Sequence, residues 1–211
     1  MRGQSPARHA LKGVPYRSKM NVMRWVSVAL VAFTFSLRLA AAPAVRLPDL
    51  DNHLVDPFLA AESSKAIVFL FASVDCPISN RYAPVVQRLY QTFSPQGVTF
   101  WLIYPNPAET PAAIRDHVKA FNYPVHALRD PNHELVKLTN VQVTPEVAVF
   151  DRSHAEVYHG RIDDRYVSLG VERPQPTRQD LSDALTSTLS GSRVKEASTQ
   201  AVGCFIADFV Q

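Results

Sequence analysis

The stretch Ala66-Ile-Val-Phe-Leu-Phe-Ala72, followed directly by Ser73-Val-Asp-Cys-Pro-Ile-Ser79, decides the fold of this 211-residue chain. The first stretch is a continuous apolar run rich in β-forming side chains, too short for a helix and typical of a strand covered on both faces. From Asn80 to Phe93 the apolar residues recur at helical spacing, and a Ser-Pro-Gln-Gly segment ends the pattern. We therefore predict a buried strand and a following helix, with Cys76 near the turn between them.

Alternating strands and helices continue along the rest of the chain. A second buried run and a second helical pattern follow the first, and the second helix starts with a Thr-Pro pair of the kind favoured at helix starts. This order predicts an α/β domain with a central mixed β-sheet flanked by α-helices. The expected strands are 98–104, 125–128, 146–150 and 156–162, the expected helices are 109–121, 132–138 and 178–189, and a small hairpin around Asp51-Asn52 and irregular chain over 163–179 complete the pattern.

The positive charge of the chain is confined to its first 44 residues. These hold seven Lys and Arg and no acid, whereas the whole chain has 22 Lys and Arg against 19 Asp and Glu, a net charge of +3. The remaining 15 bases and 19 acids give residues 45–211 a formal charge of −4. A basic surface of the kind that binds DNA or RNA is therefore not expected, and we predict no nucleic-acid partner.

Residues 1–44 have the pattern of a targeting segment. A basic stretch ends at Arg24, an apolar run extends from Trp25 to Leu37, and small residues follow it. The run is shorter than the roughly 20 residues that span a bilayer, and no cysteine follows it to take a lipid. We expect a signal peptide, a periplasmic or secreted protein, and no stable membrane span after removal of the leader; an uncleaved N-terminal anchor is the alternative. The remainder divides into a domain over 45–190 and a C-terminal tail over 191–211.

Cys76 is the residue best placed to carry chemistry. It lies where a buried strand ends and a helix begins, and the helix dipole with its unpaired N–H groups lowers the pKa of a thiol placed there. Pro77 fits this position, because a proline in the first helical turn loses no hydrogen bond. Asp75 would raise the pKa of the thiol if its carboxylate pointed toward the sulfur. The alternative is an inert buried thiol that fills space behind the strand.

Four segments of the chain resemble the thioredoxin superfamily in their order and spacing. They are Leu47-Pro-Asp-Leu-Asp-Asn52, Ala72-Ser-Val-Asp-Cys-Pro-Ile-Ser79, Val143-Thr-Pro145 and Tyr158-His-Gly-Arg-Ile-Asp-Asp-Arg165. Within the superfamily they are most similar to the exported redoxin branch, which is related to periplasmic thioredoxin-like proteins and peroxiredoxins. The resemblance spans most of residues 45–190 and implies a thioredoxin-like fold.

The resemblance also implies roles for individual residues. Cys76 would be the nucleophile, and Thr144-Pro145 would carry a cis peptide that presents backbone to an incoming disulfide. Pro77 and Ser79 complete the expected substrate-binding set. The alternative for Pro145 is a proline that simply starts a strand.

Two departures from the family pattern limit the chemistry. Ser79 stands where a dithiol thioredoxin has its second cysteine, so release of a mixed disulfide needs a thiol from elsewhere. In peroxiredoxins a proline and a hydroxyl residue precede the cysteine; here Ser73 keeps the hydroxyl but Phe69 replaces the proline, which weakens a peroxidase function. Arg161 and Arg165 are candidates to stabilise a thiolate, although ordinary surface ion pairs are equally expected of them.

Cys204, in Ala201-Val-Gly-Cys-Phe-Ile206, is the only other cysteine of the chain. Three roles compete for it: it resolves the oxidised form of Cys76, it forms a permanent disulfide that pins the tail, or it is a free or intermolecular thiol. An even number of cysteines in an exported chain favours pairing. A C-terminal Gly-Cys segment also recurs in the redoxin branch that the chain resembles.

Together these features predict an exported thiol–disulfide oxidoreductase with a single active-segment cysteine, with thiol peroxidase (antioxidant) activity as a less favoured addition. Its partners would be protein thiols and disulfides or a small peroxide. Neither a cofactor nor a metal is expected, because the seven histidines are scattered and no Cys-x-x-Cys exists. Two alternatives stay open: a redox-inert thioredoxin-fold module that binds a partner near Pro145, and an assembly factor for an exported haem or copper protein.

Overall fold

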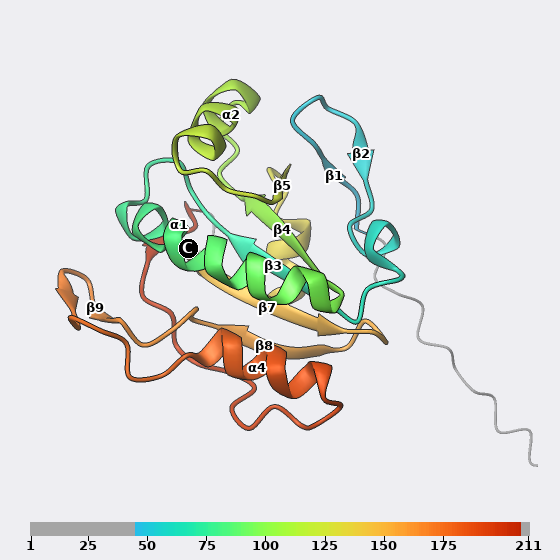
Figure 1. Cartoon of the computed structure of the whole chain (residues 1–211). Coiled ribbons are helices and arrows are strands. Elements are labelled where there is room, and N and C mark those ends of the chain that lie inside the picture. The colour runs from blue at the N-terminus through green and yellow to red at the C-terminus, as the bar shows by residue number, and fades with distance from the viewer. Residues whose placement is uncertain (1–44, 208–211) are drawn as a thin grey trace, which may run out of the picture. The chain divides into compact units, whose positions relative to one another are not determined.

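The structure, a computed structural model, describes residues 45–207. Its central sheet consists of β3 (Ala66–Phe71), β4 (Val98–Tyr104), β5 (His126–Arg129), β7 (Glu146–Asp151) and β8 (Glu156–Gly160). The strand order is β5-β4-β3-β7-β8, as Figure 1 shows. The first three strands run parallel, whereas β7 and β8 are antiparallel to their neighbours, which confirms the predicted mixed sheet.

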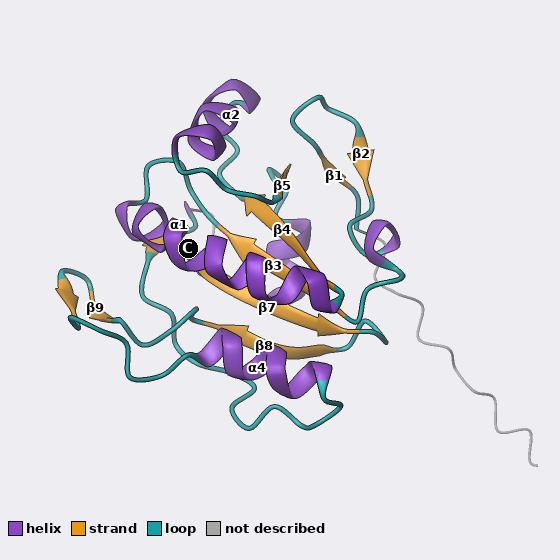
Figure 2. Cartoon of the chain, viewed as in Figure 1, coloured by secondary structure: helices purple, strands orange, loops and turns teal. Residues whose placement is uncertain are grey.

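Side chains pack on both faces of this sheet. Alternate residues of β3 enter two separate apolar clusters, as the period of a strand requires, and every residue of β3 is buried. The first cluster takes in residues of three helices, two of which, α1 and α4, lie across the front of the sheet in Figure 2. The second cluster includes residues of α3 together with Val45 and Leu47. The helices are α1 (Pro77–Phe93), α2 (Pro111–Ala120), α3 (Glu134–Thr139) and α4 (Asp180–Leu189), with 3-10 turns at Leu59–Ala61 and Ser94–Gln96.

Helix α1 begins earlier than its apolar spacing indicated. The apolar pattern started at Asn80, whereas the helix starts at Pro77, immediately after Cys76, as the proline indicated. The first turn contains a proline and a serine and therefore adds little to the apolar period, but the fixed φ of proline suits the first helical position. Cys76 consequently lies directly at the N-terminal end of the helix.

Short strands lie in segments that were expected to lack regular structure. The predicted irregular stretch 163–179 contains an antiparallel pair, β9 (Tyr166–Ser168) and β10 (Val171–Glu172), so that expectation was wrong. In the tail, β11 (Cys204–Phe205) pairs with β6 (Val143–Thr144). These strands are only two or three residues long, too short to show an alternating pattern in the sequence. The hairpin around Asp51-Asn52 is confirmed by β1 (Leu47–Pro48) and β2 (Leu54–Val55).

The predicted targeting segment, residues 1–44, lies outside the described residues. Within 45–207, no helix has the length and apolar character that crossing a membrane requires.

Candidate functional site

Cys76 caps the N-terminal end of α1. Its backbone is extended (φ −83°, ψ 110°), and its carbonyl oxygen accepts a hydrogen bond from the N–H of Asn80 at 3.1 Å. The residue is only 1% exposed. The sulfur therefore lies beside the unpaired N–H groups of the first helical turn, where a thiolate is stabilised.

Ser79, in the first turn of α1, affects the acidity of this sulfur. Its backbone N–H and its hydroxyl both lower the pKa of Cys76. Ser79 is itself 1% exposed, and its Oγ makes no hydrogen bond with any of the described residues. The serine that replaces the second cysteine of a dithiol segment is thus placed to stabilise the thiolate. Pro77, by contrast, is exposed at the first helical position.

The peptide bond between Thr144 and Pro145 is cis, as expected from the resemblance. The carbonyl oxygen of Thr144 lies 2.9 Å from Cys76 Sγ and accepts the thiol hydrogen while Cys76 is protonated. This contact brings together two segments that are 68 residues apart in the sequence. Cys76, Ser79, Thr144 and Pro145 therefore form one site at the N-terminal end of α1.

Cys204 completes the site. Residue Cys204 pairs with Thr144 in the β11–β6 ladder, and its Sγ lies 2.8 Å from Cys76 Sγ. Both cysteines are free thiols. Since a disulfide bond is about 2.05 Å long, a small movement joins the two sulfur atoms once two electrons are removed.

The two thiols differ in acidity. Burial raises the pKa of Cys76, but the hydrogen bonds from the Cys204 thiol and from Ser79 outweigh it, so the pKa lies below its ordinary value. Burial, together with the hydrogen bond to Cys76 and the charge of Cys76, raises the pKa of Cys204 to about 12. Cys76 is therefore the more acidic thiol of the pair, and the Cys204 thiol donates a hydrogen bond to Cys76 Sγ.

Residues 197–206, here called the strap, carry Cys204 to the site. The strap first contacts β8: the N–H of His159 donates to Ala197 O at 2.9 Å, and the N–H of Thr199 donates to His159 O at 3.1 Å. Gly160 allows this contact, because a Cβ there would lie 2.2 Å from Thr199 O. At its far end the strap contacts β6, where a Cβ on Gly203 would lie 2.2 Å from Thr144 O. Two glycines thus let the strap backbone lie directly on the backbone of the domain.

A buried carboxylate holds the turn that precedes Cys76. Glu109 accepts hydrogen bonds from the Ser73 hydroxyl and from the N–H of Val74, both at 2.7 Å. Burial raises the pKa of Glu109 and outweighs these two hydrogen bonds. Sequence reasoning did not identify this residue, because a single glutamate at the start of a helical pattern carries no distinctive signal. Ser73, the proposed counterpart of a peroxidase hydroxyl, is thereby engaged with Glu109.

The two arginines suggested as partners of the thiolate pair with carboxylates elsewhere. Arg161 Nε donates to Asp180 at 2.7 Å, and Arg165 Nε donates to Glu172 at 3.2 Å. Asp75, which could have raised the thiol pKa, is exposed, and its charge is not among the groups that shift the pKa of Cys76. The pKa of Cys76 is lowered chiefly by the Cys204 thiol and by Ser79, while the two arginines pair with other residues.

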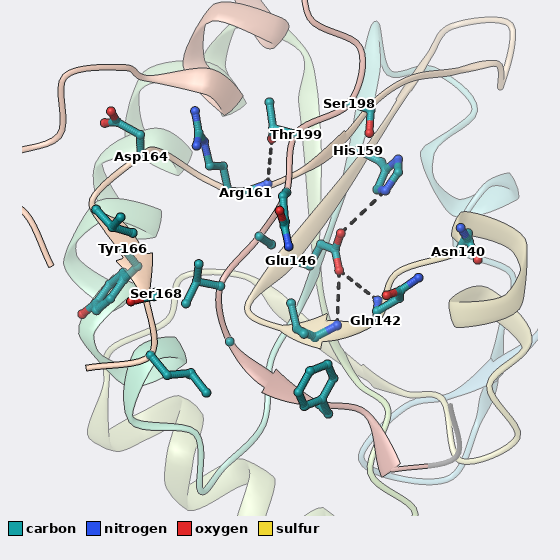
Figure 3. Close-up of a pocket in the computed structure, with 18 of the residues that line it drawn as sticks. Asn140, Gln142, Glu146, His159, Arg161, Asp164, Tyr166, Ser168, Ser198 and Thr199 are labelled. Atoms are coloured by element: carbon teal, nitrogen blue, oxygen red, sulfur yellow. Dashed lines mark hydrogen bonds and ion pairs between the residues drawn. The ribbon is translucent and has the colours of Figure 1, made fainter. Parts of the chain in front are cut away.

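A cavity of about 660 Å³ adjoins the strap between β6, β8 and the β9–β10 pair. Figure 3 shows Glu146 at its wall, between His159 and the β6 segment. One carboxylate oxygen of Glu146 accepts the N–H groups of Gln142 (2.9 Å) and Val143 (3.2 Å), and the other lies 3.7 Å from His159 Nε2. This carboxylate fixes the backbone that leads into the cis peptide.

Comparisons with known proteins agree with this architecture. The family model described as Redoxin matches residues 40–168. The hypothetical protein SMc02350 from Sinorhizobium meliloti 1021 has a similar structure, with 27% identity and a TM-score of 0.68 over 78% of this chain and 91% of that chain. An uncharacterized conserved protein from Geobacillus kaustophilus is equally similar, with 27% identity and a TM-score of 0.69 over 78% of this chain and 88% of that one.

More distant structures share the fold alone. A candidate thiol:disulfide interchange protein DsbE from Chlorobium tepidum has 15% identity and a TM-score of 0.54 over 70% of this chain and 94% of that chain. No curated protein sequence matches the chain. The thioredoxin-like fold expected from the sequence is confirmed.

Proposed function

The chain belongs to the Redoxin family, and from that premise we propose that it is a thiol–disulfide oxidoreductase in which Cys76 attacks and Cys204 resolves. The observation that carries this proposal is the 2.8 Å separation of the two sulfur atoms. The opposite shifts of their pKa values support this division of roles, because the thiolate is the nucleophile in disulfide exchange.

Two exchange steps make up the reduction of a substrate disulfide. The Cys76 thiolate attacks one substrate sulfur, a bond forms between these two atoms, and the other substrate sulfur leaves with the electron pair of the broken bond and takes up a proton. Cys204 then gives up its proton and attacks Cys76 Sγ, which releases the first substrate sulfur as a thiol and leaves a Cys76–Cys204 disulfide. A dithiol from outside the chain restores the two thiols, and the same steps in reverse oxidise a substrate dithiol.

The order of the steps follows from the causes of the Cys204 pKa. Two of the three causes that raise it are the hydrogen bond to Cys76 and the charge of Cys76. Both are lost when Cys76 enters a mixed disulfide, because its sulfur then carries no charge. The pKa of Cys204 therefore falls after the first step, and the resolving thiol becomes reactive when it is needed.

Substrate proteins must displace part of the strap, because Cys76 is buried beneath Cys204. In our proposal the backbone of Thr144 then pairs with the substrate, with Pro145, Pro77 and Ser79 around the reacting sulfur. Residues 1–44 support export to the periplasm or the medium, where protein disulfides are stable. Peroxide reduction receives no specific support, since the Ser73 hydroxyl donates to Glu109.

Trapping tests this proposal against the redox-inert binding module. The full-length Cys204→Ser variant, mixed with a disulfide-bonded peptide, should accumulate a Cys76–peptide mixed disulfide, because the resolving thiol is missing. The Cys76→Ser variant should form no adduct. If neither the wild type nor Cys204→Ser reacts with the peptide disulfide, the chain is a binding module.

A further inference from the structure

We propose that the edge of β6 beside Cys76 selects polypeptide segments with the pattern Gly-Cys-x-aliphatic, in which the cysteine is the one that exchanges. This inference rests on the proposed function and names the substrates of the same site. Its basis is the strap, because Cys204–Phe205 already pair with that edge as β11 and the N–H of Ile206 also donates to it.

Backbone pairing provides affinity without regard to sequence. Cys204 pairs with Thr144 and Phe205 with Val143, and the N–H of Ile206 donates to Gln142 O at 3.0 Å. Any extended segment that adds itself as a strand makes these bonds, as in other complexes formed by strand addition. Selection among sequences must therefore come from the side-chain positions.

The position before the cysteine admits only glycine. A Cβ on residue 203 would lie 2.2 Å from the oxygen and 2.6 Å from the carbon of the Thr144 carbonyl. Both atoms belong to the backbone next to the cis peptide, and the same carbonyl oxygen contacts Cys76 Sγ. An alanine could be admitted only by moving this carbonyl away from the reacting sulfur, so larger residues are rejected by steric conflict.

The two positions after the cysteine differ in burial and therefore in how strongly they select a side chain. Phe205 is 70% exposed, so the residue directly after the cysteine is not selected. Ile206 is 4% exposed and packs in the apolar cluster that contains Leu135 and Val141. A partner segment that replaces the strap must fill the same apolar space, which favours an aliphatic residue two positions after its cysteine.

The test uses the full-length Cys204→Ser variant and two peptides, Ala-Val-Gly-Cys-Phe-Ile and Ala-Val-Ala-Cys-Phe-Ile, each with its cysteine joined to thionitrobenzoate. The Cys76 thiolate attacks the peptide sulfur, a Cys76–peptide disulfide forms, and thionitrobenzoate leaves with the electron pair and is followed by its absorbance. We expect the glycine peptide to react at least about tenfold faster, since forcing one extra methyl group into a packed contact has an effect of that order.

Two further peptides examine the other positions. Replacing the isoleucine with aspartate should slow the reaction by a similar factor, whereas replacing the phenylalanine with serine should leave the rate within about twofold. The strap competes equally with all four peptides, so the ratios of their rates report on the edge of β6 itself. Equal rates for the glycine and alanine peptides overturn the selection and leave the proposed function intact.

A second variant, which combines Gly203→Ala with Cys204→Ser, controls for competition between the strap and the peptides at the edge of β6. Its added methyl group should lift the strap from β6 and raise the rates of all four peptides without changing their ratios. Loss of the ratio between the glycine and alanine peptides in this variant contradicts the proposal. Failure of Cys76 to react with any peptide, or with the small disulfide dithionitrobenzoate, overturns the proposed function itself.

Discussion

Cys204 Sγ lies 2.8 Å from Cys76 Sγ, although 128 residues separate the two thiols along the chain. A dithiol thioredoxin keeps its second sulfur within the same helical turn, whereas here that position is Ser79 and the second sulfur arrives on the strap. The hydroxyl of Ser79 still lowers the pKa of Cys76. Both Ser79 and Cys204 therefore lower the pKa of Cys76, and in our proposal Cys204 alone resolves its disulfide.

Replacing Ser79 with alanine should raise the pKa of Cys76. The substitution removes the hydroxyl, which lowers the pKa of Cys76, and leaves the backbone N–H in place, so we expect the pKa to rise toward its ordinary value. The pH dependence of Cys76 alkylation in the Cys204→Ser background measures it. Stability should hardly change, because the Ser79 hydroxyl makes no hydrogen bond with any of the described residues. An unchanged pKa contradicts the role of Ser79.

Replacing Cys76 with serine should make Cys204 more reactive. Burial remains, but the hydrogen bond to the Cys76 sulfur and the negative charge of Cys76 are lost, so the pKa of Cys204 falls from about 12 toward its ordinary value. Alkylation of Cys204 in Cys76→Ser, compared with reduced wild type at several pH values, measures the change. If Cys204 stays equally inert in both proteins, burial alone controls it and the proposed activation during the cycle is wrong.

Replacing Gly160 with alanine should detach the strap from β8. Its φ of +139° and the closeness of Thr199 O both oppose a side chain, so we expect a loss of about 2 kcal/mol in the free energy of unfolding. Cys76 should also become at least several-fold faster to alkylate. Gly170→Ala is the matched control, since Gly170 also has a positive φ (+77°) but no atom within 4 Å of the added Cβ. If Cys76 is alkylated at the same rate in Gly160→Ala and Gly170→Ala, the contact between the strap and β8 does not protect Cys76.

The stability of the protein should depend on the ionisation of Glu156, which lies beside His159, the residue that binds the strap. Burial, and then the charge of Glu146, raise the pKa of Glu156 to about 7. Because this value exceeds that of an unfolded glutamate, the protonated carboxyl stabilises the fold at low pH, and this contribution is lost as the pH rises from about 4.5 through about 7. Glu156→Gln should therefore become progressively more stable than wild type over that range.

The expected gain is below about 1 kcal/mol, because the side chain of Glu156 is 33% exposed and solvent screens its charge. Urea unfolding at about pH 5 and about pH 8 measures it. Glu62→Gln, at an exposed position, is the control and should show no such trend. If Glu156→Gln gains more stability over wild type at about pH 5 than at about pH 8, the pKa of Glu156 is not raised in the folded protein.

The fold was predictable because its central elements are long and strongly patterned. The continuous apolar runs of β3 and β4 indicate buried strands, and the apolar spacing in α1 indicates a helix. The proline after Cys76 marks the start of that helix. Few fold classes are compatible with this order of elements. The Thr144-Pro145 pair was identified through family resemblance, since no local pattern in the sequence distinguishes a cis from a trans proline.

The strap and the buried carboxylates were not predictable from the sequence. Residues 197–206 show no clear period, because their pairing involves backbone atoms and the edges of two short strands. The need for glycine at positions 160 and 203 is visible only in the backbone contacts of the folded chain. Glu109 likewise acts on a turn 35 residues away, a relation that spacing along one chain cannot show.

Mass spectrometry of the protein after mild oxidation tests the central claim most directly. Full-length chain, first reduced and then oxidised with a small disulfide, is digested without reduction and its cross-linked peptides are identified. The account predicts that the protein loses both thiol hydrogens and yields one peptide pair joined through Cys76 and Cys204, which a dithiol reductant separates again. Two unmodified cysteines, or adducts on Cys204 with Cys76 untouched, would contradict the account.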